Sequence, residues 1–391
     1  MNESRLRKRP LCLFILLVFT LMSFYCPPQA HADGGAPNLA YVSGTPSGVS
    51  VIDVGQAKVT KTILVAGDPH TILLSLDGRF LYVTQPALGQ VSVIAAKTGQ
   101  SVCTAHLPGA PALLAIDTDT GTLYAAGNGA AQVSALDAAT CAVRRTFKTE
   151  SPVYGLAVAL TAGSSLFGGT TNQLWVAGAH GLTIFDDQTG RVLGSVALSG
   201  AQYLSIPPGE MVYVTTRQGS VDAVGLKTKE VHQILTGGIF GPMDYDAISS
   251  EMYVPDEQHN VLDVLSPIDP GTTTLPKEPE RVIHTGVPPE AVAITNDGLL
   301  GFVALSGGKV AMLDLLERRF VYTLHAGGTP HFIITGLYPP SSKAIPPVAS
   351  PQQDSAWRNL AIVVVYALAF VFLTLLFVLL WHLRKYRKKG A

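Results

Sequence analysis

Two histidines, far apart in the chain, follow similar turn sequences. His70 ends the tetrapeptide GDPH (67–70), and His331 ends GTPH (328–331). Paired imidazoles can ligate a metal ion or serve as axial ligands of haem. The pattern supplies no third ligand, and each histidine could instead hydrogen-bond a neighbouring loop. We therefore predict that the two histidines belong to a ligand-binding site, and we predict no metal or haem cofactor.

A second set of polar residues falls between pairs of short apolar segments, where loops are expected. These residues are His180, Arg217, Asp256, Glu257 and His259. The stretch DEQH (256–259) is polar enough to join a binding site, but charged loops are also common as solvated surface, and both interpretations stay open. With His70 and His331, these five residues are the predicted ligand-binding residues of one face.

The sequence lacks the compact signatures that mark many enzymes. It contains no G-x-S-x-G, H-E-x-x-H, C-x-x-C or phosphate-binding G-x-x-x-x-G-K motif. Two acid pairs, Asp117 with Asp119 and Asp244 with Asp246, alternate along expected strands. Such pairs serve as general acid and base only where the surroundings shift their pKa values. No catalytic residue is predicted.

The polar candidates must be positioned by short segments that recur along the chain. Residues 74–99, LSLDGRFLYVTQPALGQVSVIAAKTG, represent the pattern. An apolar segment ends in a polar turn, and a run with an aromatic residue near its start follows. An alternating run then ends in a second turn, and a short polar–apolar segment completes the unit. Alternation with a period of two, bounded by Gly, Pro and Asp, indicates β-strands.

One aromatic residue marks each repeat of this unit. The seven are Tyr41, Tyr82, Tyr124, Trp175, Tyr213, Tyr253 and Phe302, with spacings of 41, 42, 51, 38, 40 and 49 residues. Four strands in forty-odd residues are typical of a propeller blade. Residues 39–65 supply strands two to four of one blade, and residues 331–337 supply its missing first strand. We predict an all-β, seven-bladed β-propeller over residues 38–338 with this velcro closure.

The repeat resembles that of the YVTN family of β-propellers. Tyr82-Val83-Thr84-Gln85 differs from the family tetrapeptide at one position, and VSVI (91–94) and KTG (97–99) fit the rest of the repeat. VSVIDVGQ (49–56) also fits the third strand. The resemblance implies a propeller of the surface-layer or periplasmic type. The family motif is structural, so the resemblance implies no catalytic residue.

The two ends of the chain carry apolar segments that predict export and anchoring. A basic start, an apolar stretch and Ala30-His31-Ala32 predict a signal peptide over residues 1–32. Residues 358–382 predict a single transmembrane helix, because 22 uncharged residues would span roughly 33 Å. A Pro- and Ser-rich linker (339–357) precedes this helix, and a basic tail (383–391) follows it and is expected to stay cytoplasmic.

The charge of the exported body argues against nucleic-acid binding. Ten of the 27 Lys and Arg residues, but only one of the 28 Asp and Glu residues, lie outside residues 33–356, so this body carries a net charge of −10. Nucleic-acid partners require a basic surface. The expected partners are the membrane, through the C-terminal helix, and an unidentified protein, polymer or small ligand at the loop-rich face.

Two cysteines remain in the exported body after the signal peptide is removed. Cys103 and Cys141 form an even pair in an oxidising compartment, which permits a disulfide. They occupy nearby but unequal positions in successive repeats, which favours two buried thiols. Both alternatives stay open at the level of sequence.

The sequence therefore predicts a membrane-anchored propeller on the extracytoplasmic side of the cell membrane, acting as a binding, recognition or scaffold module. One alternative is an enzyme, lactonase-like or redox, that uses residues of the central channel. Another is a structural component of a surface layer. The regular repeat supports the fold and leaves these three functions open, because function depends on the loops that the fold carries.

Overall fold

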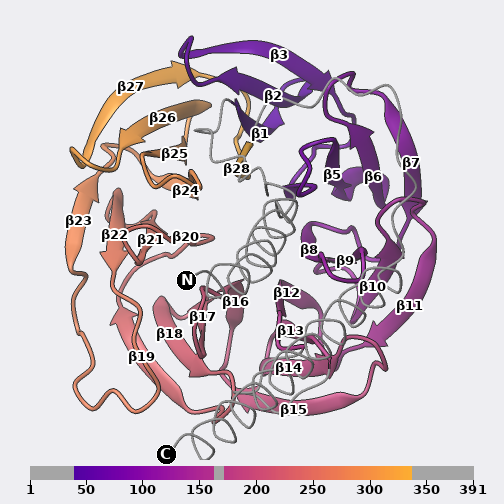
Figure 1. Ribbon diagram of the computed structural model, residues 1–391, viewed down its shortest axis with the longest axis vertical. Coiled ribbons are helices and arrows are strands. Elements are labelled where there is room, and N and C mark those ends of the chain that lie inside the picture. Colours follow the sequence, from indigo (N-terminus) through magenta and orange to yellow (C-terminus); the bar gives the residue numbers. More distant parts are fainter. Residues whose placement is uncertain (1–38, 163–170, 337–391) are drawn as a thin grey trace, which may run out of the picture.

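The computed structural model describes residues 39–162 and 171–336, which form seven four-stranded antiparallel sheets around a central axis (Figure 1). The predicted seven-bladed β-propeller is confirmed. The predicted signal peptide (1–32), linker (339–357), transmembrane helix (358–382) and basic tail (383–391) lie outside the described residues. Within the described residues, no helix has the length and apolar character needed to cross a membrane.

The blades are numbered from the N-terminus, and each runs from an inner to an outer strand. Blade 1 consists of β28 (Ile333–Gly336), β1 (Leu39–Thr45), β2 (Gly48–Asp53) and β3 (Lys58–Leu64); blade 2 of β4 (Ile72–Leu74), β5 (Phe80–Gln85), β6 (Gln90–Ala95) and β7 (Ser101–His106), with the 3-10 helix η1 (Pro86–Leu88). Blade 3 consists of β8 (Leu113–Asp117), β9 (Thr122–Ala126), β10 (Gln132–Asp137) and β11 (Val143–Lys148); blade 4 of β12 (Val153–Ala159), β13 (Gln173–Gly178), β14 (Gly181–Asp186) and β15 (Val192–Ala197).

The remaining blades follow the same plan. Blade 5 consists of β16 (Ala201–Ser205), β17 (Met211–Thr216), β18 (Ser220–Gly225) and β19 (Val231–Thr236); blade 6 of β20 (Asp244–Asp246), β21 (Glu251–Asp256), β22 (Val261–Leu265) and β23 (Arg281–His284); blade 7 of β24 (Pro289–Ile294), β25 (Leu300–Leu305), β26 (Lys309–Asp314) and β27 (Arg319–His325). The middle strands are buried on both sides, whereas outer strands such as β27 expose alternate residues.

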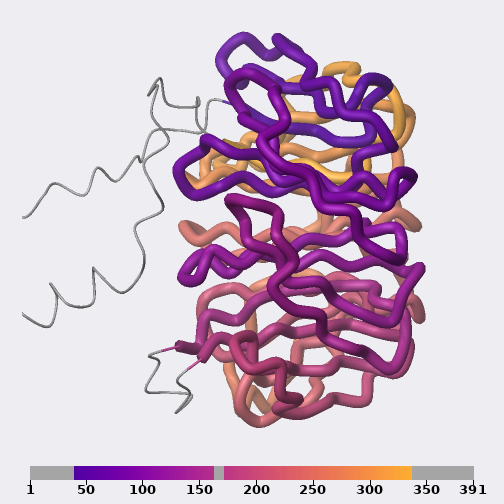
Figure 2. Tube along the Cα trace, turned by 90° about the vertical axis from the view of Figure 1, so that its right-hand side faces the viewer, coloured from indigo at the N-terminus to yellow at the C-terminus, as the bar shows by residue number. Residues whose placement is uncertain are grey.

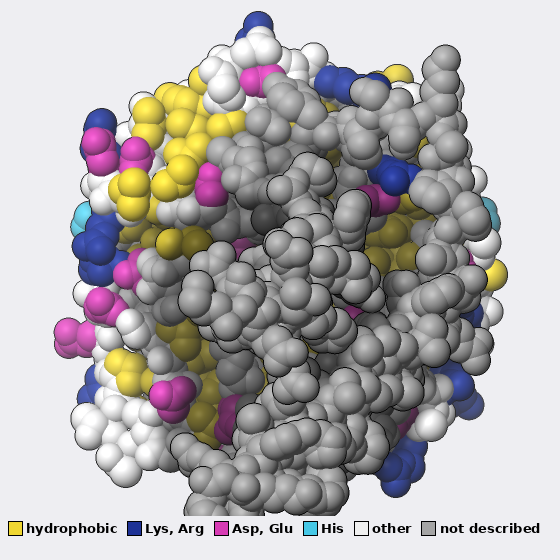
Figure 3. Space-filling model, viewed as in Figure 1, with side chains coloured by type: hydrophobic (Ala, Val, Ile, Leu, Met, Phe, Trp, Pro, Cys, Tyr) yellow, Lys and Arg dark blue, Asp and Glu magenta, His cyan; other side chains and the backbone are white. Residues whose placement is uncertain are grey.

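The ring has two faces, which are seen edge-on at the left and right of the side view in Figure 2. The loops that enter each inner strand and the loops between the second and third strands form one face, here called the mouth face. The turns between the first and second strands form the opposite face, here called the hairpin face. Leu39 pairs with Gly336, so both ends of the described chain lie at the hairpin face. This face is viewed in Figure 3, where Lys and Arg side chains lie around the rim and hydrophobic side chains lie closer to the axis.

The pairing of β28 with β1 closes the ring as predicted. Val42 pairs with Ile333 and Leu39 with Gly336 in an antiparallel register. In addition to these pairs, the Gly44 carbonyl of β1 accepts a hydrogen bond of 2.9 Å from the Thr329 amide in the loop before β28. Gly44 has a φ of +75°, and a Cβ there would lie 2.0 Å from the Thr329 carbonyl oxygen. Only glycine allows this approach of the two chain segments.

The aromatic residue of each repeat packs between one blade and the next. All seven predicted aromatics are buried, with at most 5% of their surface exposed. Trp175 of blade 4, for example, clusters with Val212 and Val214 of blade 5, and Phe302 of blade 7 clusters with Ala40 and Val42 of blade 1. Seven such clusters form the core, so the repeated aromatic is a packing residue and not part of a site.

A disulfide joins two neighbouring blades. Cys103 of β7 is bonded to Cys141, which follows β10, with 5.8 Å between their Cα atoms. The sequence favoured two free thiols, and that preference is wrong. The two positions in the repeat are unequal, but blade packing brings the outer strand of blade 2 against a turn of blade 3. The crosslink adds a covalent tie to a contact that is otherwise made by side-chain packing.

We expect the closure to control the stability of the whole ring. A chain that ends at His331 lacks β28 and leaves β1 as an open edge, so its free energy of unfolding should fall by at least about 3 kcal/mol, because Ile333 alone is a fully buried core side chain. A chain that ends at Ala356 keeps β28 and is the control. Urea unfolding measures both, and an unchanged midpoint in the shorter chain would contradict the closure.

Candidate functional site

A cavity of about 300 Å³ lies on the propeller axis at the mouth face, and all seven blades contribute to it. It is here called the axial cavity. Its wall is formed by the loops that precede the inner strands, by residues of those strands, and by the loop between the second and third strands of blade 6. The lining residues are His70, Thr71, Leu73, Leu113, Leu114, Gly155, Leu156, Tyr203, Leu204, Pro242, Met243, Glu257, Glu290, His331 and Phe332.

The two predicted histidines meet in this cavity. Their rings are stacked, with 4.9 Å between centroids and an interplanar angle of 16°. His331 precedes β28, the inner strand of blade 1, and His70 precedes β4, the inner strand of blade 2, so the velcro closure makes them neighbours. The Ser43 hydroxyl donates to the backbone carbonyls of both His70 and Phe332, which fixes the two loops against each other.

The stacked pair keeps one of its rings neutral. Burial and the adjacent His331 lower the pKa of His70 to about 4. His331 has its Nε2 atom 3.4 Å from Asp68 Oδ1 at the rim of the cavity. A neutral imidazole both donates and accepts a hydrogen bond. His70 therefore offers the cavity a polar group without a charge at physiological pH.

Two glutamates line the cavity on the neighbouring blades. Glu257 comes from the loop after β21, as predicted, and Glu290 comes from the start of β24. Burial, followed by the charge of Glu290, raises the pKa of Glu257. Burial also raises the pKa of Glu290, although the charge of His331 opposes this shift. The two carboxyl groups are thus close enough to each other and to His331 to interact electrostatically.

Sequence reasoning missed Glu290, although a signal was present. In the loops that enter the inner strands, His70, Glu290 and His331 each directly follow a proline. The residue after this proline therefore occupies one repeated place, at which three blades carry an ionisable side chain. All three line the axial cavity. Reading the position across repeats, instead of searching for histidine alone, would have found Glu290.

Tyr203 was also missed, and it connects the cavity to the predicted Arg217. Burial raises the pKa of Tyr203, the charge of Glu257 raises it further, and the charge of Arg217 lowers it. The Arg217 guanidinium lies 3.5 Å from the centroid of the Tyr154 ring. Arg217 therefore sits near the mouth of the cavity, held over an aromatic ring.

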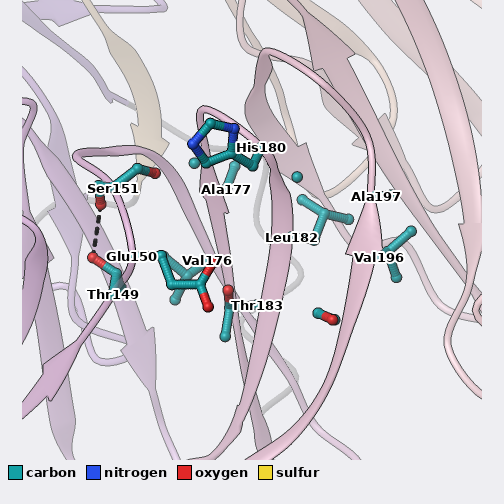
Figure 4. Close-up of a pocket in the computed structure, with 13 residues that line it drawn as sticks. Thr149, Glu150, Ser151, Val176, Ala177, His180, Leu182, Thr183, Val196 and Ala197 are labelled. Atoms are coloured by element: carbon teal, nitrogen blue, oxygen red, sulfur yellow. Dashed lines mark hydrogen bonds between the residues drawn. The ribbon is translucent and has the colours of Figure 1, made fainter.

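His180 lies elsewhere on the mouth face, in a separate pocket of about 180 Å³ between blades 3 and 4. Figure 4 shows it on the turn after β13, across the pocket from Glu150. The side chain of Thr149 donates a hydrogen bond of 2.8 Å to the carbonyl oxygen of Ser151 in the same pocket. The structure does not bring His180 together with the other predicted residues.

Asp256 and His259 are also outside the axial cavity. The Asp256 carboxylate accepts hydrogen bonds from the backbone amides of Ile239 and Gln258, and lies 2.6 Å from His259 Nδ1. Asp256 is 2% exposed. Asp256 is the last residue of β21 and shapes the loop that carries Glu257, so its role toward the axial cavity is to hold that loop.

Of the two acid pairs singled out in the sequence, Asp117, Asp244 and Asp246 are held inside the scaffold, whereas Asp119 is exposed. Asp244 Oδ2 accepts a 2.6 Å hydrogen bond from the Ile294 amide of blade 7, which links two inner strands. Asp117 Oδ1 accepts from the Asn172 side chain of blade 4, and the pKa of the neighbouring Asp187 is raised to about 7 by burial and by its hydrogen bond with Asp117. These carboxyl groups join blades, and they lie outside the axial cavity.

Among the described residues, no group of three or more His, Cys, Asp or Glu side chains is arranged to hold a metal ion. The fold and the site together define the class as a seven-bladed β-propeller with an axial cavity of small-molecule size at its mouth face.

Comparisons with known proteins agree with this class. Neither a protein-family model nor the sequence of a curated protein matches the chain, so the resemblance to the YVTN family stays a prediction. The chain is similar in structure to a periplasmic gluconolactonase of Pseudomonas aeruginosa, with a TM-score of 0.61 and 16% identity over 78% of this chain and 100% of that one.

Two further similar structures differ in their described activities. A proposed 6-phosphogluconolactonase of Bacteroides uniformis has a TM-score of 0.61 and 15% identity over 76% of this chain and 99% of that one. The dihydro-heme d1 dehydrogenase NirN, solved in complex with DHE, has a TM-score of 0.55 and 15% identity over 76% of this chain and 74% of that one. At these identities the likeness shows the fold alone.

The electrostatics of the histidine pair give a testable result. His70 should titrate with a midpoint near pH 4 in imidazole NMR spectra, because burial and His331 both disfavour its charged form. Because this folded-state pKa lies below the usual 6.5, the contribution of His70 to stability is present above pH 6.5 and is lost as the pH falls toward 4. His331→Gln removes one cause and should raise the midpoint. A wild-type midpoint near 6.5 would show that the ring is not buried as described.

Proposed function

We propose that the protein binds one small, neutral, polyhydroxylated ring in the axial cavity. This proposal rests on one observation: the cavity wall has a polar part and an apolar part. Hydrogen-bonding side chains lie on the consecutive blades 5, 6, 7, 1 and 2, whereas blades 3 and 4 contribute only leucine and glycine. A cyclic sugar derivative has hydroxyl groups at its edge and C–H groups on its faces, so it can satisfy both parts of such a wall.

The chemistry of the polar wall supports this ligand class. Glutamate carboxylates accept hydrogen bonds from hydroxyl groups, and a neutral imidazole or a tyrosine hydroxyl can donate or accept. Glu257 and Glu290 are half-buried and have raised pKa values, so each has lost water that a ligand hydroxyl can replace. The cavity volume is at the lower end of the range for small-molecule sites, which suits a single ring.

The proposal also includes a cellular location for the binding site, based on the two apolar segments predicted near the ends of the sequence. The predicted signal peptide and transmembrane helix would place the propeller on the extracytoplasmic side of the cell membrane, as a membrane-anchored binding module. The described chain ends at the hairpin face, opposite the axial cavity. A tether that leaves from Gly336 would therefore hold the mouth face away from the membrane, open to ligands.

Binding is tested by calorimetry with monosaccharides and sugar lactones. We expect saturable binding that weakens about tenfold or more in Glu290→Gln, because a ligand hydroxyl loses a charged acceptor worth roughly 1.5–3 kcal/mol. His180→Ala removes a mouth-face side chain outside the axial cavity and is the matched control. Equal affinity of Glu290→Gln and the wild type, or a loss in His180→Ala, would place the ligand elsewhere.

A second candidate function is hydrolysis of a small lactone. It is favoured by Glu290, whose carboxyl group has a raised pKa and interacts with His331, and by the gluconolactonases among the similar folds. In this reaction Glu290 would take a proton from water, the resulting oxygen would attack the ester carbonyl, and the ring C–O bond would break. The released alkoxide would take the proton, leaving a hydroxy acid.

Hydrolysis is tested separately from binding with glucono-1,5-lactone in a pH-stat, because each ring opened releases one proton near neutral pH. If the protein is a lactonase, Glu290→Gln should lower kcat by about 100-fold or more, with a smaller change in KM, since a general base contributes 10²–10⁴-fold. Binding without a rate above that of the uncatalysed reaction would reject the lactonase and leave the binding function standing.

A further inference from the structure

A third pocket lies apart from both the axial cavity and the pocket beside His180. It has a volume of about 370 Å³ and lies between the outer strands of blades 5 and 6, where β19, β22 and β23 contribute to its wall. It is here called the side pocket. Phe240, Val261 and Val282 form apolar parts of its lining, and Asp256 and Asp263 form acidic parts. Basic side chains line it as well, namely Lys277, His259 and His284. Among the described residues, Lys277 is exposed and forms no ion pair with either aspartate.

The equivalent place in blade 5 shows what the side pocket lacks. Asp222 pairs with Val214 in the same register in which Asp263 pairs with Val254, so the two aspartates occupy one repeat position. In blade 5 the Ser220 hydroxyl donates a 2.6 Å hydrogen bond to Asp222.

The residue at the Ser220 position in blade 6 is Val261, which has no hydroxyl to donate. Thr216, which contacts Ser220 at 2.6 Å, is replaced by a second acid, Asp256. Blade 6 thus keeps the buried aspartate of blade 5 and loses the two hydroxyl groups that accompany it.

The Asp263 carboxylate consequently lacks the hydroxyl donor that its counterpart Asp222 has. It is 6% exposed, and among the residues that the structure describes none donates a hydrogen bond to it or forms an ion pair with it. Burial, followed by the charge of Asp256, raises its pKa to about 6, and the charge of the nearby His259 opposes this rise. His259 is bonded to Asp256 and not to Asp263. Because Asp263 lines the side pocket, a donor that enters the pocket can reach this carboxylate.

We propose that the side pocket binds a primary ammonium group carried on an apolar stem. The ammonium would donate to Asp263, and the stem would lie against Phe240 and Val282. A compact ammonium with three donors can satisfy a carboxylate in the wall of such a pocket. The same chemistry occurs in a free alkylamine and in a lysine side chain of a partner protein.

The test uses the full chain and two probes. Pentylammonium represents the free amine, and the peptide acetyl-Gly-Lys-Gly-amide represents the lysine side chain. Calorimetry should detect saturable binding of at least one probe, and 1-pentanol, which has the stem without the charge, should bind at least tenfold more weakly. Asp263→Ser should lower the affinity tenfold or more. Serine occupies the same repeat position in blades 2 and 3, as Ser92 and Ser134, so this variant is expected to fold.

The matched control is Asp222→Ser, which changes the aspartate that blade 5 already satisfies and should leave the affinity unchanged. Binding of pentylammonium and peptide alike supports the ammonium chemistry with either source, and binding of the peptide alone assigns the source to a protein partner. Absence of saturable binding for both probes, equal binding of 1-pentanol, or retention of affinity in Asp263→Ser would overturn the proposal. Thermal melts of both variants establish that the compared chains are folded.

Discussion

The closure of the ring through β28 and β1 is the constraint on which the rest of the structure depends. Each blade buries its aromatic side chain only when the next blade is present, so seven interfaces require a closed ring. Closure brings together segments almost 300 residues apart, but the entropic cost rises by only about 0.6 kcal/mol for each doubling of the loop. The same pairing carries His331 to the side of His70. The candidate site therefore exists only in the closed ring.

The repeat separates residues that hold the ring from residues that are free to vary. The aromatic of the second strand and the small residues around it are enclosed between blades in every repeat. The residue that follows the loop proline instead reaches the axis, where neighbouring blades carry different side chains. A histidine pair and a glutamate can occupy this position in three blades without any change to the packing between blades. The scaffold fixes the position of these side chains, and the residue type at that position differs from blade to blade.

Much of the fold could be predicted because its signals are local. Period-two alternation, turn residues and one aromatic in each repeat are visible without knowing any tertiary contact. The site was harder to predict, because its residues come from seven different blades and meet only at one end of the propeller axis. The histidine pair and Glu257 were found, whereas Glu290 and Tyr203 were missed. Asp222 and Asp263 look equivalent in sequence, and only the residues beside them decide that one is satisfied and the other is not.

The axial cavity and the side pocket differ in the charge of their lining groups, and this difference favours different ligands. In the axial cavity, burial lowers the pKa of His70 and raises those of Glu257 and Glu290, so every shift moves a group toward its neutral form. Such a wall favours a neutral ligand rich in hydroxyl groups. In the side pocket, Asp256 keeps its partner His259, and the adjacent Asp263 has lost the donors of blade 5. That carboxylate gains most from a ligand that brings its own positive charge.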